Sequence, residues 1–297
     1  RRMEVREMED VKTLLAHVRH QLDEAGAERI PMPDLEAREL TACALGLDRR
    51  LLPALGARPV TASECEKTEA LVARRLSGEP LAYVLGEWDF YGITLRVTPD
   101  VLIPRSDTER LCELAIERVR TMQNPRVLDL CSGSGCIALA LLHEVTAAQA
   151  VAVDVSPAAV DVANGNAARL GLNDRYRCVT GSALEPIADA DRNAFDLMVC
   201  NPPYITADEL RELDRDVAEF EPHLALYGGE DGLDFYRTVM KTWRYAVKPG
   251  GYLLFECGWK QGQAVAEICR KAGLTEVQVE TDYAGVPRIV CARVPLP

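Results

Sequence analysis

From Pro125 onward the chain alternates short apolar runs with amphipathic stretches, and this alternation restricts the fold more than any other feature. Apolar runs of strand length, each followed by a helical pattern, are typical of a mostly parallel sheet with crossover helices on its faces. The last two expected strands have no helix between them, so we expect an antiparallel hairpin at one edge. The expected strands are 126–130, 150–155, 177–180, 195–200, 251–256, 276–280 and 288–293, and the expected helices are 136–145, 157–170, 233–247 and 261–272.

The first 85 residues show helical spacing instead. Leu14, Val18 and Leu22 share one face of a first helix. A second helix is expected with Asp34 as its N-cap and Gly46 near its end, and a third is expected to begin near Thr61 or Ser63. For the third, Ser63 with Glu66 predicts a capping box. We interpret this region as a small helical module for recognition or packing.

Strand-like alternation then replaces helical spacing. Trp88 and Phe90 alternate before Tyr91-Gly92, and Ile93 and Leu95 alternate after it, which predicts a β-hairpin. A helix is expected to start at Ser106 or Asp107. The predicted organisation is a helical domain at 1–85, a hairpin linker at 86–105 and a sheet domain at 106–297.

Composition argues against several classes of function. The 297 residues are 48% hydrophobic and 27% charged, as in globular proteins, and the longest uncharged run, 130–142, is too short to span a membrane. The ten cysteines form no C-x-x-C pair and the four histidines are scattered, so no metal site is expected. A net charge of −12 opposes nucleic-acid binding. The amino terminus resembles neither a signal nor a transit peptide, and we expect a cytoplasmic protein.

The tetrapeptide Asn201-Pro202-Pro203-Tyr204 follows the apolar run 195–200, at the strand end where open α/β sheets bind their ligands. The prolines cannot continue a sheet ladder, which leaves the carbonyls of Asn201 and Pro202 free to face a ligand. An Asn oxygen and a neighbouring carbonyl can accept both hydrogens of a planar NH2 group while a Tyr ring stacks on it. The tetrapeptide therefore predicts a pocket for an amide or aromatic amine.

A glycine-rich turn lies between the first expected strand of the sheet and its helix. It offers close backbone approach and free helix N–H groups to a ligand, but it has no third glycine in the position that a dinucleotide-binding turn requires. Asp154, about 19 residues beyond Gly135, ends the second strand, where a carboxylate can accept the ribose hydroxyls of an adenosine-type cofactor. The residues expected at this cofactor site are Asp129, Cys131, Ser132, Gly133, Ser134, Gly135 and Asp154.

The chain resembles the HemK/PrmC family, the class I S-adenosylmethionine-dependent peptide chain release factor glutamine methyltransferases, over nearly its whole length. The motifs that carry the resemblance are Leu102-Ile103-Pro104-Arg105, Asp107-Thr108-Glu109, the turn at 129–135, the tetrapeptide at 201–204, Phe220-Glu221-Pro222 and the glycine-rich segment 228–232. The resemblance implies a Rossmann-like, seven-stranded methyltransferase sheet. It also implies methylation of the Gln amide in the Gly-Gly-Gln motif of release factors, with S-adenosyl-L-homocysteine as product.

Carried over by position, the resemblance implies that 131–135 holds the methionine part of the cofactor, that Asp154 binds its ribose, and that Asn201 to Tyr204 bind and orient the glutamine. Asn201 is also expected to border the cofactor. Apart from the resemblance, Arg105 stands just before an expected helix start, where two interpretations stay open: an exposed surface charge, or a substrate-binding contact to an anionic group in the site. The family commonly places an acidic residue and an aromatic beside the adenine, where this chain has Ser182 and Ala183. The helical module is expected to help hold the release factor, and the protein is expected to be a monomer that contacts neither nucleic acid nor membrane.

Three other functions stay open at this point. Ser106 replaces a Pro that is often found after the Arg, and it is reminiscent of the related glutamine methyltransferases that act on ribosomal proteins. An adenine methyltransferase would use the same tetrapeptide but needs a basic groove and base-stacking aromatics. A cofactor-binding module without catalysis could keep the fold alone, and methyl transfer to any substrate excludes it.

Overall fold

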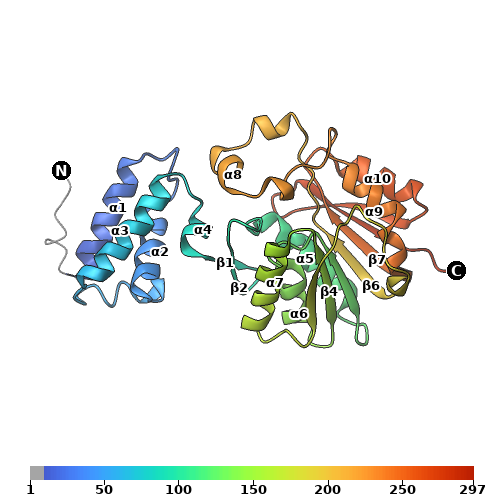
Figure 1. Cartoon of the computed structure of the whole chain (residues 1–297), viewed down its shortest axis with the longest axis horizontal. Helices are drawn as coiled ribbons and strands as arrows, with labels where there is room; N and C mark the ends of the chain where they lie inside the picture. Colours follow the sequence, from blue (N-terminus) through green and yellow to red (C-terminus); the bar gives the residue numbers. More distant parts are fainter. Residues whose placement is uncertain (1–9) are drawn as a thin grey trace. The chain divides into compact units, whose positions relative to one another are not determined.

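A computed structural model of the chain describes residues 10–297 (Figure 1). The expectation about a leader peptide rests largely on residues 1–9, which lie outside the described residues. The chain divides into two compact units. The helical unit comprises the described residues up to Gly86 together with 215–220, and the sheet unit comprises 87–214 and 221–297. None of the helices within 10–297 is long and apolar enough to cross a membrane.

The helical unit is built on a small apolar core. Its helices are α1 (Val11–Glu24), α2 (Pro33–Leu45), the 3-10 turn η2 (Arg49–Leu51), α3 (Ala62–Leu76), α4 (Leu81–Leu85) and α8 (Arg215–Phe220). Leu14, Val18, Leu40 and Val72 are almost fully buried in this core, which is why their helical spacing predicted the helices correctly.

The structure corrects both predicted caps in this unit. Helix α2 begins at Pro33, a residue favoured in the first turn because its missing N–H needs no partner there, and Asp34 lies inside the helix and caps nothing. In α3 the capping box uses Thr61 and Glu64 rather than Ser63 and Glu66. The S/T-x-x-E pattern occurs twice here, starting at Thr61 and at Ser63. The helix uses the first copy, whose Glu64 is also held by a hydrogen bond from Arg58 Nη2 at 2.7 Å. Gly46 ends α2 in the left-handed conformation, as expected.

The sheet unit contains a seven-stranded sheet in the order β5-β4-β3-β6-β7-β9-β8. All pairs from β5 to β7 are parallel, and β9 pairs antiparallel with β7 and with the edge strand β8, which confirms the predicted edge hairpin. The strands are β3 (Arg126–Leu130), β4 (Gln149–Asp154), β5 (Tyr176–Thr180), β6 (Phe195–Cys200), β7 (Val247–Glu256), β8 (Thr275–Thr281) and β9 (Pro287–Arg293).

Helices cover both faces of this sheet (Figure 1). One face carries α5 (Ser106–Val119), α6 (Cys136–Glu144) and α7 (Pro157–Arg169), and the other carries α9 (Asp234–Lys241) and α10 (Gly262–Lys271). Two separate apolar clusters fill the spaces between helices and sheet. The predicted hairpin forms as β1 (Glu87–Phe90) and β2 (Ile93–Arg96), and Phe90, Ile93 and Leu95 join the core beside α5 and α6.

The single helix expected at 233–247 is wrong in its second half. Helix α9 ends at Lys241, a 3-10 turn follows at Trp243–Ala246, and β7 already begins at Val247. Thr242 leaves the helical conformation, and its hydroxyl donates to the carbonyl oxygen of Thr238 at 2.9 Å. The Thr242 N–H donates to the same oxygen at 3.0 Å, so the helical hydrogen-bond ladder ends at this residue.

Candidate active site

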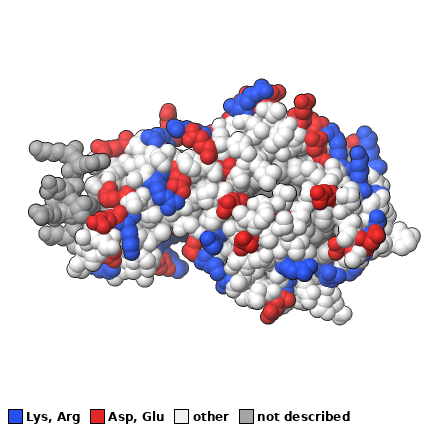
Figure 2. All heavy atoms as spheres, in the orientation of Figure 1, with Lys and Arg blue, Asp and Glu red and all other residues white. Residues whose placement is uncertain are grey.

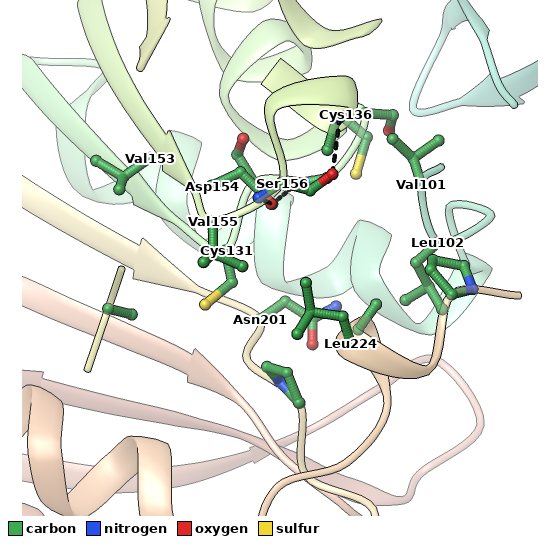
Figure 3. A pocket seen from close by; sticks show the side chains of 18 of the residues that line it. Val101, Leu102, Cys131, Cys136, Val153, Asp154, Val155, Ser156, Asn201 and Leu224 are labelled. Carbon is green, nitrogen blue, oxygen red and sulfur yellow. Dashed lines mark hydrogen bonds between the residues drawn. The ribbon is translucent and has the colours of Figure 1, made fainter. Parts of the chain in front are cut away.

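A pocket lies over the carboxyl ends of β3, β4, β5 and β6 in the sheet unit (Figure 3). Cys131, Asp154 and Asn201 come from three of these strand ends and line the pocket together. The segment before α5, from Asp100 to Arg105, forms another part of the wall, together with Pro222, Leu224 and Ala225. The structure therefore brings together in one cavity the glycine turn, the strand-end aspartate and the tetrapeptide, which the sequence separates by up to 70 residues.

The glycine turn needs an unusual backbone. Cys131, Gly133 and Gly135 all have positive φ angles, of 59°, 54° and 81°. A side chain at Gly135 would also collide, because its Cβ would lie 2.7 Å from the hydroxyl oxygen of Tyr176. Gly135 is the N-cap of α6, so the helix starts directly beneath the pocket. The turn presents two buried serines to this pocket, and the hydroxyl of Ser134 has no hydrogen-bond partner among the described residues.

The two predicted aspartates have different surroundings. Asp154 lines the pocket, where its Oδ2 accepts the Gly133 N–H at 2.8 Å and its Oδ1 accepts the Ser156 N–H at 3.0 Å. Asp129 is fully buried and is absent from the pocket wall. Its Oδ2 accepts the N–H of Ala138 in the first turn of α6, and burial raises the pKa of Asp129 to about 7. Asp129 thus supports the turn from below.

Ser182 and Ala183 follow β5 and line the pocket, as does Leu184. Ser182 Oγ accepts the N–H of Leu184 at 3.1 Å, and Ala183 is buried in the apolar cluster behind it. Leu184 and Leu224 are exposed apolar side chains at the pocket, 47% and 62% accessible. Nothing in the local sequence pattern singled out either leucine.

The tetrapeptide is divided between the pocket and the protein interior. Asn201 and Pro203 line the pocket, whereas Pro202 and Tyr204 are absent from its wall. Asn201 Nδ2 donates to Thr108 Oγ1 at 3.4 Å, which leaves Asn201 Oδ1 for other partners. Tyr204 turns its hydroxyl inward and donates to Glu256 Oε1 at 3.3 Å, and burial raises the pKa of Tyr204.

Residues far away in the sequence hold this tetrapeptide in place. Gln261 Nε2 donates to the carbonyl oxygen of Tyr204 at 3.0 Å. Gly228 and Gly232 pack against the backbone of the same segment: a Cβ on Gly232 would lie 2.2 Å from the Tyr204 carbonyl oxygen, and one on Gly228 would lie 2.5 Å from the Pro203 carbonyl oxygen. These contacts explain why the 228–232 segment is rich in glycine.

Arg105 also lines the pocket, and its side chain is about 40% exposed. It forms an ion pair with Glu221, whose side chain is almost completely buried, and Glu221 Oε2 also accepts the N–H of Ile103 at 3.2 Å. Glu221 therefore holds residues 103–105 in place.

Asn166 connects two other segments. Its Nδ2 donates to the carbonyl oxygens of Arg96 and of Ser134, both at 3.0 Å.

No group of three or more His, Cys, Asp or Glu residues within 10–297 is arranged to hold a metal ion. The pocket instead combines a carboxylate held by backbone N–H groups, an unpaired serine hydroxyl, an amide and apolar walls. This set of groups suits an organic ligand that has both hydroxyl and apolar parts.

Comparison with known proteins agrees with this fold. The PrmC N-terminal domain model matches residues 13–86, and the methyltransferase small domain model matches residues 108–219. A methyltransferase structure from Pyrococcus furiosus, 16% identical, shares the fold with a TM-score of 0.50 over 68% of this chain and 89% of its own.

Two relatives are far closer in sequence. The release factor glutamine methyltransferase of Bradyrhizobium diazoefficiens is 41% identical over 287 residues, covering 95% of this chain and 93% of its own. The release factor glutamine methyltransferase of Geobacter sulfurreducens is 40% identical over 284 residues, with 96% of both chains covered. Identity at this level over nearly the full length of both aligned chains shows common family membership, and the chain belongs to the release factor glutamine methyltransferase family.

Proposed function

We propose that this protein transfers a methyl group from S-adenosylmethionine to the side-chain amide nitrogen of the Gln in the Gly-Gly-Gln motif of peptide chain release factors. The main support is that Asn201 lines the same pocket as the glycine turn and Asp154. The names of relatives about 40% identical over nearly the whole chain support the same substrate.

The groups around the pocket fit such a cofactor. Asp154 is held by two backbone N–H groups and keeps further lone pairs for the ribose hydroxyls. The unpaired Ser134 hydroxyl and the turn at 131–135 would hold the methionine part. Ser182, Ala183 and Leu184 would flank the adenine, with a hydroxyl and apolar contacts in place of an acidic residue and an aromatic. When bound, the cofactor supplies an electrophilic methyl group on a sulfonium.

The protein would orient the target nitrogen. A glutamine amide is a weak nucleophile because its nitrogen lone pair is delocalised. Asn201 Oδ1 and the carbonyl oxygen of Pro202 would accept its two hydrogens and direct the nitrogen toward the methyl carbon. Orientation of this kind can supply roughly 7–11 kcal/mol of the barrier, so the reaction needs no strong base.

Other residues would serve recognition. Tyr204 would pack beside the amide through its ring while its hydroxyl stays bound to Glu256. Arg105 would meet an anionic group of the cofactor or the substrate at the pocket, with its charge held in place by Glu221. We propose that the helical unit, residues 10–86, helps to bind the release factor. Because the proposed substrate acts during translation, we expect the reaction to take place in the cytoplasm.

A labelled methyl-transfer assay tests the proposal. The substrates are an intact release factor, the same factor with its Gly-Gly-Gln glutamine replaced, a mixture of ribosomal proteins, and adenine-containing DNA. We expect label on the intact factor alone, and Asn201→Ala should abolish that transfer while S-adenosylhomocysteine still binds.

Label on a ribosomal protein would keep the reaction but replace the substrate, and label on DNA would revive the adenine methyltransferase. The molecular surface makes the second result unexpected, because acidic and basic side chains are interspersed on the face shown in Figure 2, without the broad basic stripe that duplex binding requires. Binding of cofactor without transfer to any substrate would contradict the proposal entirely.

A further inference from the structure

We propose that the sheet unit carries a second binding site, which takes the phosphate group of a small organic phosphate, at the end of the sheet opposite the candidate active site. A cavity of about 290 Å³ lies where β3, β4 and β5 begin. The candidate active site lies over the carboxyl ends of the same three strands. The proposal therefore concerns a separate site, and it does not depend on the proposed function.

The strand register places two arginines on one face of the sheet, on either side of β4. Arg126 in β3 pairs with Gln149 in β4, and Arg177 in β5 pairs with Val151, two residues further along β4. Residues two apart in a strand share a face, so the side chains of Arg126, Gln149 and Arg177 leave the sheet on the same side. Neighbouring strands lie about 4.8 Å apart, which separates β3 from β5 by roughly 10 Å. A ligand over Gln149 can therefore be reached from both sides.

Both arginines carry a positive charge that no carboxylate within residues 10–297 neutralises through an ion pair. Neither guanidinium donates a hydrogen bond within that range either. Arg126 Cζ lies over the ring of Phe195, 5.1 Å from its centroid, and this cation–π contact uses the face of the guanidinium rather than its N–H groups. Arg177 and Gln149 are exposed, and the Gln149 amide also lacks a partner among the described residues.

The other charged groups around the cavity do not cancel this charge. Arg175 also lines the cavity, but its guanidinium donates to three carbonyl oxygens in and just after the last turn of α6, so it serves the framework. Asp174 is the single carboxylate residue in the described lining, and it is exposed. Asp196 lies next to the cavity in sequence, but it is paired with Lys248 Nζ at 2.7 Å.

A second cavity in the sheet unit shows the opposite arrangement. Arg118 and Arg293 both lie over the ring of Tyr252, at 5.5 Å and 5.2 Å from its centroid. Here the protein supplies its own anion, because Arg293 Nη1 donates to Glu276 Oε1 at 2.8 Å. At the first cavity the two arginines have no such partner in the described chain, and a ligand from outside would supply the negative charge.

The arrangement favours a phosphate over a carboxylate. A guanidinium pairs best with two oxygens side by side, and a carboxylate has only two in total. A phosphate monoester has three free oxygens, enough to accept from both arginines and from the Gln149 amide together. A cavity of about 290 Å³ is suited to a small phosphorylated compound, and the net charge of −12 opposes a long polyanion such as RNA.

Isothermal titration calorimetry with pyrophosphate, at fixed ionic strength, tests the site. We expect pyrophosphate to bind, and Arg126→Gln or Arg177→Gln should raise its Kd at least about tenfold, the size expected for losing hydrogen bonds between charged groups. Asp174→Asn removes the carboxylate from the lining and should lower the Kd instead. Arg118→Gln is the matched control, because it removes a guanidinium that also lies over an aromatic ring but belongs to the other cavity. Its Kd should equal that of the unmodified protein.

Further ligands identify what binds. Ribose 5-phosphate should bind with the same dependence on Arg126 and Arg177, whereas ribose should not bind. Saturating S-adenosylhomocysteine should leave the Kd of pyrophosphate unchanged, because the two sites lie at opposite ends of the strands. Competition between the two ligands would place the phosphate in the candidate active site and would overturn the proposal.

Three other results would also contradict it. One is the absence of binding of both phosphates up to millimolar concentrations, and another is an equal Kd in all four folded variants. The third is tighter binding of a single-stranded oligouridylate than of pyrophosphate, lost in the Arg126 and Arg177 variants, which would replace the small ligand by RNA. The unfolding midpoint of each variant, measured without ligand, shows that a changed Kd does not come from a damaged fold.

Discussion

At the scale of single residues, the environment of a carboxylate decides its role more than its position in a motif does. Asp129 and Asp154 both end or nearly end a strand beside the glycine turn. Asp154 is partly exposed, faces the pocket and accepts two backbone N–H groups, whereas Asp129 is completely buried, with Oδ1 lacking any partner within the described chain. Two different consequences follow for substitution of each residue by its amide.

Asp154→Asn should weaken cofactor binding. The amide offers one acceptor oxygen instead of two, and it loses the charge that strengthens hydrogen bonds to ribose hydroxyls. We expect the Kd of S-adenosylhomocysteine to rise at least about tenfold, since hydrogen bonds to a charged group contribute about 1.5–3 kcal/mol. Isothermal titration calorimetry measures this directly. Asp161→Asn, an exposed change in α7, is the matched control, and an equal loss of affinity there would contradict the role of Asp154.

Asp129 should make stability depend on pH. Burial raises the pKa of Asp129 in the folded state to about 7, above its ordinary value of 3.8. The folded protein therefore holds this proton longer than the unfolded chain does, so stability falls as the pH rises from about 4 to about 7 and changes no further above that. In Asp129→Asn this fall should be absent. We expect its unfolding midpoint to exceed that of the unmodified protein by a few degrees at pH 8 and by less at pH 5, and a constant difference would contradict the raised pKa.

At the scale of elements, the sequence predicted the strands and their ends, but it did not predict hydrogen bonds between residues far apart in the chain. Buried parallel strands are continuous apolar runs, so their carboxyl ends, and with them Asp154 and Asn201, could be placed from the sequence alone. The contacts of Glu256 with Tyr204 and of Asn166 with Ser134 join residues 52 and 32 positions apart, and no periodicity reports them. The predicted cap of α3 was wrong because the capping pattern occurs twice, and the pattern does not show that Glu64 of the first copy also binds Arg58.

The segment 228–232 shows how one element shapes another, and it yields a prediction at this scale. Gly232→Ala should displace the tetrapeptide, because the new Cβ would lie 2.2 Å from the Tyr204 carbonyl oxygen and 2.3 Å from Gln261 Nε2. Misplacement of a reacting group by about 1 Å can cost about 100-fold in rate, and we expect kcat to fall by that order.

The control for this change is Gly171→Ala. Gly171 has a φ of 68°, close to the 73° of Gly232, but nothing lies within 4 Å of its added Cβ. It therefore carries the same backbone penalty, about 1 kcal/mol or somewhat more, without the collision. Activity lost equally in both variants would mean that backbone strain, and not displacement of the tetrapeptide, explains the effect. Steady-state kinetics with both proteins at matched folded concentration decides between them.

At the scale of the whole molecule, the chain forms two units with separate cores, and it contributes to the helical unit in two separate segments. The first unit ends at Gly86, but residues 215–220, which follow the tetrapeptide by eleven positions, also cluster with that unit before the chain returns at Glu221. Glu221 then pairs with Arg105 at the pocket. Chain order alone suggested a single early domain and could not reveal this second passage, because α8 is short and has no clear apolar period.

If the helical unit binds the release factor, weakening its core should affect large and small substrates differently. Leu40 is fully buried in that core, and Leu40→Ala should cost the unit about 2–5 kcal/mol of stability. We expect the KM for an intact release factor to rise at least about tenfold, whereas transfer to a short Gly-Gly-Gln peptide, which needs only the pocket, should stay nearly unchanged. Leu142→Ala, a fully buried change in the sheet unit, should instead lower transfer to both substrates by the same factor. A Leu40→Ala variant that loses both activities equally would show that the helical unit supports the fold of the enzyme rather than its choice of substrate.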